Sequence, residues 1–381
     1  MANILNIFNQ FPKNYDLTIL QTFFAKPFKQ ENGKWTKPSL SLVAKDNNTG
    51  KKHVCEIEDP EYIWFLAKDP DKLTHHYDFL PKDEVEAIQC PNRELEKCIA
   101  QATGNMKFFT NNIANGEYRE NAKLHTLNQV FFSDQNIEDH YRFWFNRLFK
   151  NEIHSVRKAY LDIEVDISDI VGDFPEPGEA PVNVVTYIND GVINTYILRD
   201  PKNPLVQEFE NQVASGEIER DLRKLIEFAI GDEARQRKFN IFGYNFNVKF
   251  FDQEIQLLGS LFRQINTEEP DFLMAWNMAF DIPYLIQRIR NLGYRPESIM
   301  CHPDFKVNPK AEYFIDTRME NNYAERGDYA YISAYTVYLD QMIQFASRRK
   351  GQSAFASFKL NDIGAQICGV QKLNYHHITT D

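Results

Sequence analysis

The chain has 381 residues, a formal net charge of −11, 43% hydrophobic residues and 25% charged residues. This composition excludes an intrinsically disordered protein, and the length allows two domains with separate cores. The acidic balance argues against a general nucleic-acid binder, although a site that holds metal ions would itself be acidic. The five scattered cysteines favour a reducing compartment and argue against a disulfide framework or a structural zinc site.

The first residues do not form a signal peptide, because polar side chains interrupt the apolar ones at Asn3, Asn6, Asn9, Gln10 and Lys13. The sequence contains no apolar run long enough to cross a bilayer. We therefore expect a soluble, cytoplasmic protein that does not interact with membranes.

The first region, residues 1–155, mixes strand-like and helix-like segments and carries no recognisable chemistry. Ser39–Ala44 and His53–Glu58 have strand character, whereas Glu138–Lys150 has the aromatic pattern of a buried core helix. We expect an α+β domain here.

The second region opens with a strictly alternating stretch, Lys158–Ile167. Ala159, Leu161, Ile163, Val165 and Ile167 would share one face of a strand, and the carboxylates of Asp162, Glu164 and Asp166 the other. A row of like charges is unfavourable. A bound cation would compensate it, and carboxylate oxygens favour Mg²⁺ or Mn²⁺. The alternative is an ordinary acidic face that is simply solvated.

Strands and helices alternate further along the chain. The Asn189-Asp190-Gly191 turn between two β-branched runs predicts a hairpin. Helices are predicted over about 205–230 and 252–265. A third helix is predicted to start at Asp281, at or near its N-cap, and to end at Gly293. The remaining predicted elements are strands at Val182–Ile188, Val192–Leu198, Phe272–Trp276, Arg318–Tyr323 and Tyr329–Val337, and a helical stripe of Leu360, Ile363 and Ile367 closed by Gly369.

Three patterns follow one another from the acidic strand onward. They are Asp162-Ile163-Glu164, then Phe174-Pro175-Glu176-Pro177, then Trp276-Asn277 with Phe280-Asp281-Ile282-Pro283-Tyr284. In this order they resemble the 3′–5′ proofreading exonuclease of family B DNA polymerases, and most closely the replicative polymerases of T-even-like bacteriophages. The resemblance covers residues 155–375, approximately.

The resemblance implies an α/β fold: a ribonuclease H-like exonuclease domain over 156–381, with a mixed central sheet flanked by helices, and an N-terminal domain of the family B polymerase type over 1–155. It also implies a two-metal site for Mg²⁺ or Mn²⁺ that hydrolyses the 3′-terminal nucleotide of single-stranded or primer-template DNA. Asp162 would bridge the two ions, Glu164 would bind one and help to place the attacking water, and Asp281 would hold the other side. Phe174, Asn277 and Phe280 would contact the DNA 3′ end, although a packing role fits these three nearly as well. A phage-encoded enzyme would work in the cytoplasm of its host.

The third motif of this family, Tyr-x-x-x-Asp, is not found after Asp281, and no Asp-Thr-Asp signature of a polymerase palm is present. His376 and Asp381 have the His-x-x-x-x-Asp spacing of a sister exonuclease class, but an aspartate at the very end of the sequence would be a poor ligand. We therefore expect the N-terminal part of a polymerase, either a truncated product or a split subunit that lacks the last helix or helices of its exonuclease domain. A second polymerase chain would then supply the third motif, palm, fingers and thumb.

Two other interpretations stay open. One is a non-catalytic scaffold or DNA-binding subunit with an incomplete exonuclease site that needs a partner chain. The other is an unrelated nuclease of the ribonuclease H-like fold, which would prefer RNA.

Overall fold

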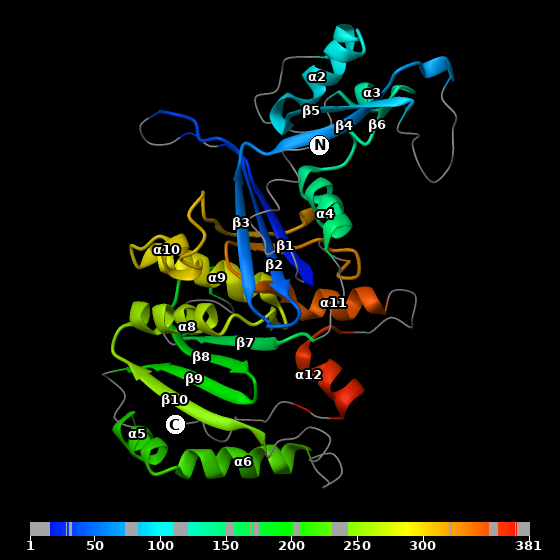
Figure 1. Ribbon diagram of the computed structural model, residues 1–381. Coiled ribbons are helices and arrows are strands. Elements are labelled where there is room, and N and C mark those ends of the chain that lie inside the picture. The colour runs from blue at the N-terminus through cyan, green and yellow to red at the C-terminus, as the bar shows by residue number, and fades with distance from the viewer. Residues whose placement is uncertain are drawn as a thin grey trace. The chain divides into compact units, whose positions relative to one another are not determined.

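The computed structural model describes residues 16–27, 29, 33–72, 83–109, 121–149, 155–167, 170, 175–200, 206–230, 243–319, 322–349, 357–369 and 371. The chain divides into two compact units (Figure 1). Unit 1 comprises residues 1–155 and 303–309, and unit 2 comprises residues 156–302 and 310–381.

Unit 1 contains two small antiparallel sheets around a core of aromatic and aliphatic side chains. One sheet has the order β1-β2-β3 and the other the order β5-β4-β6. The predicted helix in this region is confirmed as α4, which buries Tyr141 and Phe145. The strands are β1 Leu17–Ala25, β2 Ser39–Asp46, β3 Lys52–Glu58, β4 Glu61–Ala67, β5 Val85–Pro91 and β6 Val130–Phe131, and the helices are α2 Leu95–Ala102, α3 Ala122–His125 and α4 Ile137–Leu148.

Unit 2 is built on a six-stranded mixed sheet in the order β10-β9-β8-β7-β11-β14. The strand β7 pairs antiparallel with β8 and parallel with β11, which in turn pairs parallel with β14. A separate antiparallel pair, β12-β13, follows α10 in the chain. The strands are β7 Lys158–Val165, β8 Val182–Asn189, β9 Val192–Leu198, β10 Asn245–Phe251, β11 Phe272–Ala275, β12 Ala311–Phe314, β13 Tyr329–Ile332 and β14 Val337–Asp340.

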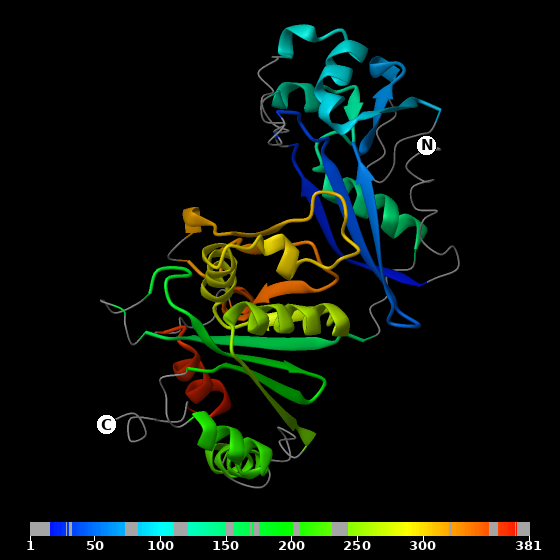
Figure 2. The ribbon, with the colours of Figure 1, turned by 90° about the vertical axis from the view of Figure 1, so that its left-hand side faces the viewer.

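The helices α8 and α9 cover one face of this sheet (Figures 1 and 2). Their apolar side chains, among them Leu258, Phe262, Ile282 and Leu285, form one buried core with the inward residues of β7, β8 and β11. The helices of unit 2 are α5 Val206–Ala214, α6 Glu217–Ile230, α8 Glu254–Glu268, α9 Met278–Asn291, α10 Pro296–Met300, α11 Gln341–Arg348 and α12 Leu360–Ile363. Unit 2 is therefore a mixed α/β layer structure.

Several sequence predictions for unit 2 are confirmed and two are wrong. Asp190 and Gly191 have φ of 47° and 77°, as the predicted hairpin turn between β8 and β9 requires. Residue 318 lies in a 3₁₀ turn, Thr317–Met319, and not in the strand predicted for 318–323. Residues 329–337 form two strands and not one, because the chain leaves the β12-β13 pair before it enters the main sheet as β14.

Candidate functional site

The acidic residues of unit 2 gather where three parallel strands end. Because β7, β11 and β14 run in the same direction, their carboxyl ends lie at one edge of the sheet. In open α/β sheets this edge is the usual place for ligand sites. Helix α9 begins shortly after β11, and α11 begins directly after β14. The positive ends of two helices therefore start at this edge.

Asp162 and Glu164 lie on the exposed face of β7, as the alternating sequence predicts. The opposite face carries Ala159, Leu161 and Ile163, which are buried in the core. Parallel pairing with β11 ends at Tyr160 opposite Met274. Asp162 is therefore two residues beyond the last pair, beside the connection from β11 to α9.

Asp281 lies in the first turn of α9, which begins at Met278 and thus three residues earlier than predicted. Its side chain is deeply buried, at 5% exposure. Burial and the nearby charge of Asp162 raise the pKa of Asp281 to about 7, and hydrogen bonds from its own N–H and from that of Ile163 oppose this rise. The structure thus places the carboxylate of Asp281 against β7 at Ile163, near Asp162 and toward the carboxyl end of the strand.

Asp340 is a fourth carboxylate at this edge, to which the sequence assigned no role. It ends β14 in register with Ala275, and it is 7% exposed. Its Oδ1 accepts a hydrogen bond of 3.0 Å from the N–H of Ile343 and so caps α11. Burial raises its pKa, and backbone N–H groups from the first turns of α11 and of α9 counteract that rise. An apolar strand that ends in Asp before a helix is the signal that could have marked it as a cap.

Of the three residues predicted to contact DNA, the structure describes two. Asn277 is exposed and directly precedes α9, where its side chain makes no capping hydrogen bond. Phe280 is half-buried, with its ring centroid 5.3 Å from that of Tyr284. Phe174, like His376 and Asp381, lies outside the described residues.

The paired carboxylates of Asp162 and Asp281 fit a divalent cation. Both supply hard oxygen ligands, and a cation would compensate the charge of Asp281, whose pKa is raised by burial and by repulsion from Asp162. In the part of the chain that the structure describes, however, no group of three or more His, Cys, Asp or Glu side chains lies close enough together to hold a metal ion. The roles predicted for Asp162, Glu164 and Asp281 therefore stay predictions, and the pair is the part of the site on which they rest.

Comparison with known proteins gives one family. The model described as DNA polymerase family B, exonuclease domain, matches residues 122–363, which is more than half of the chain. A comparison with curated proteins gives no match. None of the described helices is long and apolar enough to span a membrane.

Proposed function

The chain belongs to the family B DNA polymerases through their exonuclease domain, and from this premise we propose that its acidic edge hydrolyses the 3′-terminal nucleotide of DNA. The observation that supports this most directly is the placement of Asp281, a buried carboxylate held against β7 beside Asp162. Both residues belong to motifs that resemble those of the family.

Asp162, Glu164 and Asp281 are the residues proposed to hold Mg²⁺ or Mn²⁺. A divalent cation bound there would supply an activated water and stabilisation of the leaving 3′-oxygen. The protein itself determines how firmly each carboxylate is held. Asp281 is fixed by its hydrogen bond from Ile163, whereas Asp162 and Glu164 face outward from β7.

The DNA 3′ end would approach over the start of α9. Asn277 is exposed there, and we propose that the half-buried ring of Phe280 contacts the terminal base. Phe174 is proposed for the same role on the strength of the Phe-Pro-Glu-Pro pattern alone. Single-stranded DNA, or the unpaired end of a primer on its template, is the substrate that such contacts accept without sequence preference.

The finer parts of the assignment are proposals of the same kind. They are the ribonuclease H-like architecture of residues 156–381, the polymerase type of residues 1–155, the affinity to bacteriophage polymerases, cytoplasmic action and a second polymerase chain that supplies the third motif. Addition of such a chain to residues 1–381 should increase nuclease activity if it completes the site.

The test uses the 381-residue chain, a single-stranded DNA labelled at its 5′ end, and Mn²⁺. We expect stepwise shortening from the 3′ end, and we expect Asp162→Asn and Asp281→Asn each to lower the rate by at least roughly 100-fold, since interactions with developing charge are worth that much. Asp362→Asn, an exposed aspartate on α12, is the matched control. Equal rates in the wild type and in the Asp162→Asn, Asp281→Asn double variant would reject the proposal.

A second candidate function is DNA binding without hydrolysis. It is favoured by the lack of a three-ligand cluster among the described residues. In this case the chain would bind single-stranded DNA in a fluorescence anisotropy assay and show no turnover with Mn²⁺. Turnover by the purified wild-type chain would rule this candidate out.

A further inference from the structure

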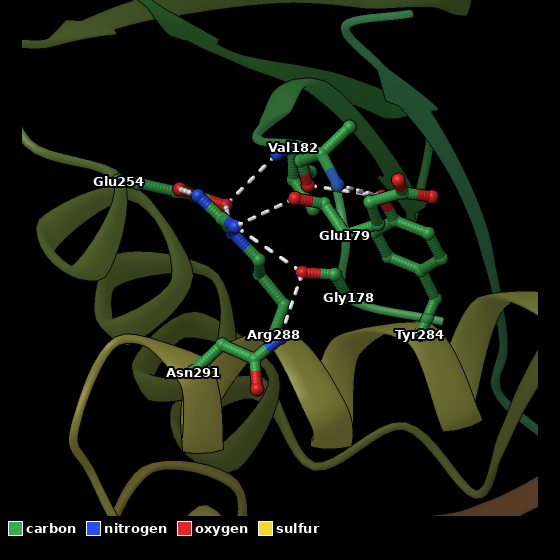
Figure 3. Close-up of polar contacts among 8 residues, drawn as sticks. Gly178, Glu179, Val182, Glu254, Tyr284, Arg288 and Asn291 are labelled. Carbon is green, nitrogen blue, oxygen red and sulfur yellow. Dashed lines mark hydrogen bonds and ion pairs between the residues drawn. The ribbon is translucent and has the colours of Figure 1, made fainter. Parts of the chain in front are cut away.

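One stripe of α9 carries both Asp281 and a set of polar residues that the proposed chemistry does not use. Asp281, Tyr284, Arg288 and Asn291 follow one another at helical spacing and so lie along one side of the helix. Figure 3 shows that the last three reach toward residues 178–182, where the connection from β7 enters β8.

Arg288 is the centre of these contacts. Its Nε and Nη2 donate to Oε1 and Oε2 of Glu254 at 2.8 and 2.7 Å, a bidentate pair. Its Nη1 donates to the carbonyl oxygens of Gly178 and Glu179 at 3.2 and 3.3 Å. Asn291 adds a hydrogen bond of 2.9 Å to the same Gly178 oxygen. The guanidinium thus joins α8, α9 and the connection from β7 to β8.

The charge of Arg288 is already compensated inside the protein. The side chains of Arg288 and Glu254 are 14% and 6% exposed. A second bond fixes Glu254, whose Oε1 accepts from the N–H of Val182 at 2.8 Å. Breaking a buried pair of this kind leaves an uncompensated charge. The guanidinium of Arg288 therefore has a structural role, since its donors are used by internal partners and not by a DNA phosphate.

Tyr284 makes a second, uncharged attachment. Its hydroxyl donates to the carbonyl oxygen of Ala180 and accepts from the N–H of the same residue, both at 2.9 Å. Glycine at position 178 allows the backbones to approach closely. A Cβ built there would lie 2.8 Å from the backbone nitrogen of Arg288. Gly178 thus lies directly against the backbone of α9, and Ala180 is bound to the Tyr284 side chain.

These attachments end next to the acidic strand. Val182, which Glu254 holds, is the partner of Val165 in the pairing of β7 with β8. Val165 directly follows Glu164 and lies three residues after Asp162. Helix α9 is therefore tied to the same end of β7 that Asp281 must face.

We infer that Glu254, Tyr284 and Arg288 form a clamp that positions Asp281 against Asp162, so that the two carboxylates can act on one cation. The inference rests on the proposed function, because the clamp matters only if the two carboxylates work together. In this inference the clamp residues have no direct contact with DNA or metal and act through the placement of α9 against the paired strands β7 and β8.

The test compares two clamp variants with two matched controls in the 381-residue chain. Arg288→Lys keeps the charge but not the bidentate fork, and Tyr284→Phe removes only the hydroxyl. The controls are Arg290→Lys, at an exposed position of α9, and Tyr294→Phe, at a residue that is 48% exposed. Four quantities are measured: kcat and KM on single-stranded DNA, the Kd for Mn²⁺ by calorimetry, the rate of cleavage after Glu179 by a glutamate-specific protease, and the thermal unfolding midpoint.

We expect the clamp variants to stay folded and to be cleaved faster after Glu179. Their kcat should fall roughly 10- to 100-fold and their Kd for Mn²⁺ should rise roughly tenfold, with KM almost unchanged, since misplacement of supporting groups has effects of this size. The controls should match the wild type in all four measurements.

Two results would overturn the inference and leave the proposed function intact. The first is faster cleavage after Glu179 with wild-type kcat and Mn²⁺ affinity, because the clamp would then be open without effect on the site. The second is a raised KM with unchanged kcat in Arg288→Lys, which would make Arg288 a phosphate contact. If Asp281→Asn bound Mn²⁺ and cut DNA like the wild type, the proposed function would fail instead. If the wild-type chain neither bound Mn²⁺ nor cut DNA, both the proposed function and the inference would be rejected.

Discussion

Asp281→Asn is expected to stabilise the metal-free chain at alkaline pH while it removes the proposed activity. The pKa of Asp281 is about 7 in the folded chain, against an ordinary value of 3.8. Because the folded value is the higher one, the stabilisation from this group is fully present below about pH 3.8 and is lost as the pH rises through about 7. A difference of about three pH units, at roughly 1.4 kcal/mol for each, amounts to about 4 kcal/mol.

The assay is urea unfolding in the presence of EDTA, for the wild type, for Asp281→Asn and for the control Asp362→Asn. A neutral amide avoids the burial of a charge at any pH. The advantage of Asp281→Asn should therefore grow from less than about 2 kcal/mol near pH 5 to about 4 kcal/mol near pH 8.5. Added Mn²⁺ should stabilise the wild type and not this variant, because only the wild type gains a ligand that binds its folded state.

An advantage that did not change with pH would refute this reasoning, because it would come from packing or from hydrogen bonding and not from a buried charge. A loss of stability in Asp281→Asn at alkaline pH would refute it as well, and would show that the carboxylate is better compensated in the folded chain than its burial beside Asp162 implies.

Three further predictions concern single residues. Asp340→Ala should lower the free energy of unfolding by about 1–2 kcal/mol because α11 loses its cap. Asp340→Asn can still cap the helix and should lower this free energy much less, as urea unfolding would show. Burial lowers the pKa of His140 to about 3 from 6.5. The stabilisation from neutral His140 is therefore fully present above pH 6.5 and is lost as the pH falls toward 3. The wild type should lose about 3 kcal/mol of unfolding free energy between pH 6.5 and about 4, and His140→Gln should not, as acid unfolding would show. Gly178→Ala should lower the thermal unfolding midpoint, because φ is +78° and the added Cβ would meet the backbone of α9 at 2.8 Å.

The local elements of unit 2 could be predicted where a short-range signal decides them. The alternation in β7 follows from one buried and one exposed face, and the turn at Asp190-Gly191 follows from residues that tolerate positive φ. The start of α9 could not be predicted as well. Asn277 directly precedes the helix and is a favoured N-cap type, but its side chain makes no capping hydrogen bond. The N–H groups of Met278 and Ala279 instead interact with the carboxylate of Asp340, which is far away in the sequence.

The pairing of strands without a hairpin signal could not be predicted from the sequence. The strand β12 forms at Ala311–Phe314 because its partner is Tyr329–Ile332, where Ala311 and Ile332 meet in register and are both buried. The motif containing Asp281 could be recognised from its neighbours, but its pKa depends on desolvation and on Asp162, which only the folded chain brings close. The sequence therefore indicates Asp281 as a candidate, but it does not predict the raised pKa of this residue.

The arrangement of carboxylates at this edge has a consequence for binding. Neutralising the charge of Asp281 relieves the cost of its burial and the repulsion from nearby carboxylates, and a proton and a cation are two ways to do so. Backbone N–H groups at the starts of α9 and α11 oppose the rise in the pKa of Asp340 without cancelling it, and Asp281 has a pKa of about 7 despite two hydrogen bonds. The charge of Asp281 therefore remains unfavourable, mainly because it is buried and also because the charges of Asp162 and Asp340 lie nearby. A cation that binds there replaces a proton at neutral pH, so that the strain which weakens the metal-free fold becomes part of the free energy of metal binding.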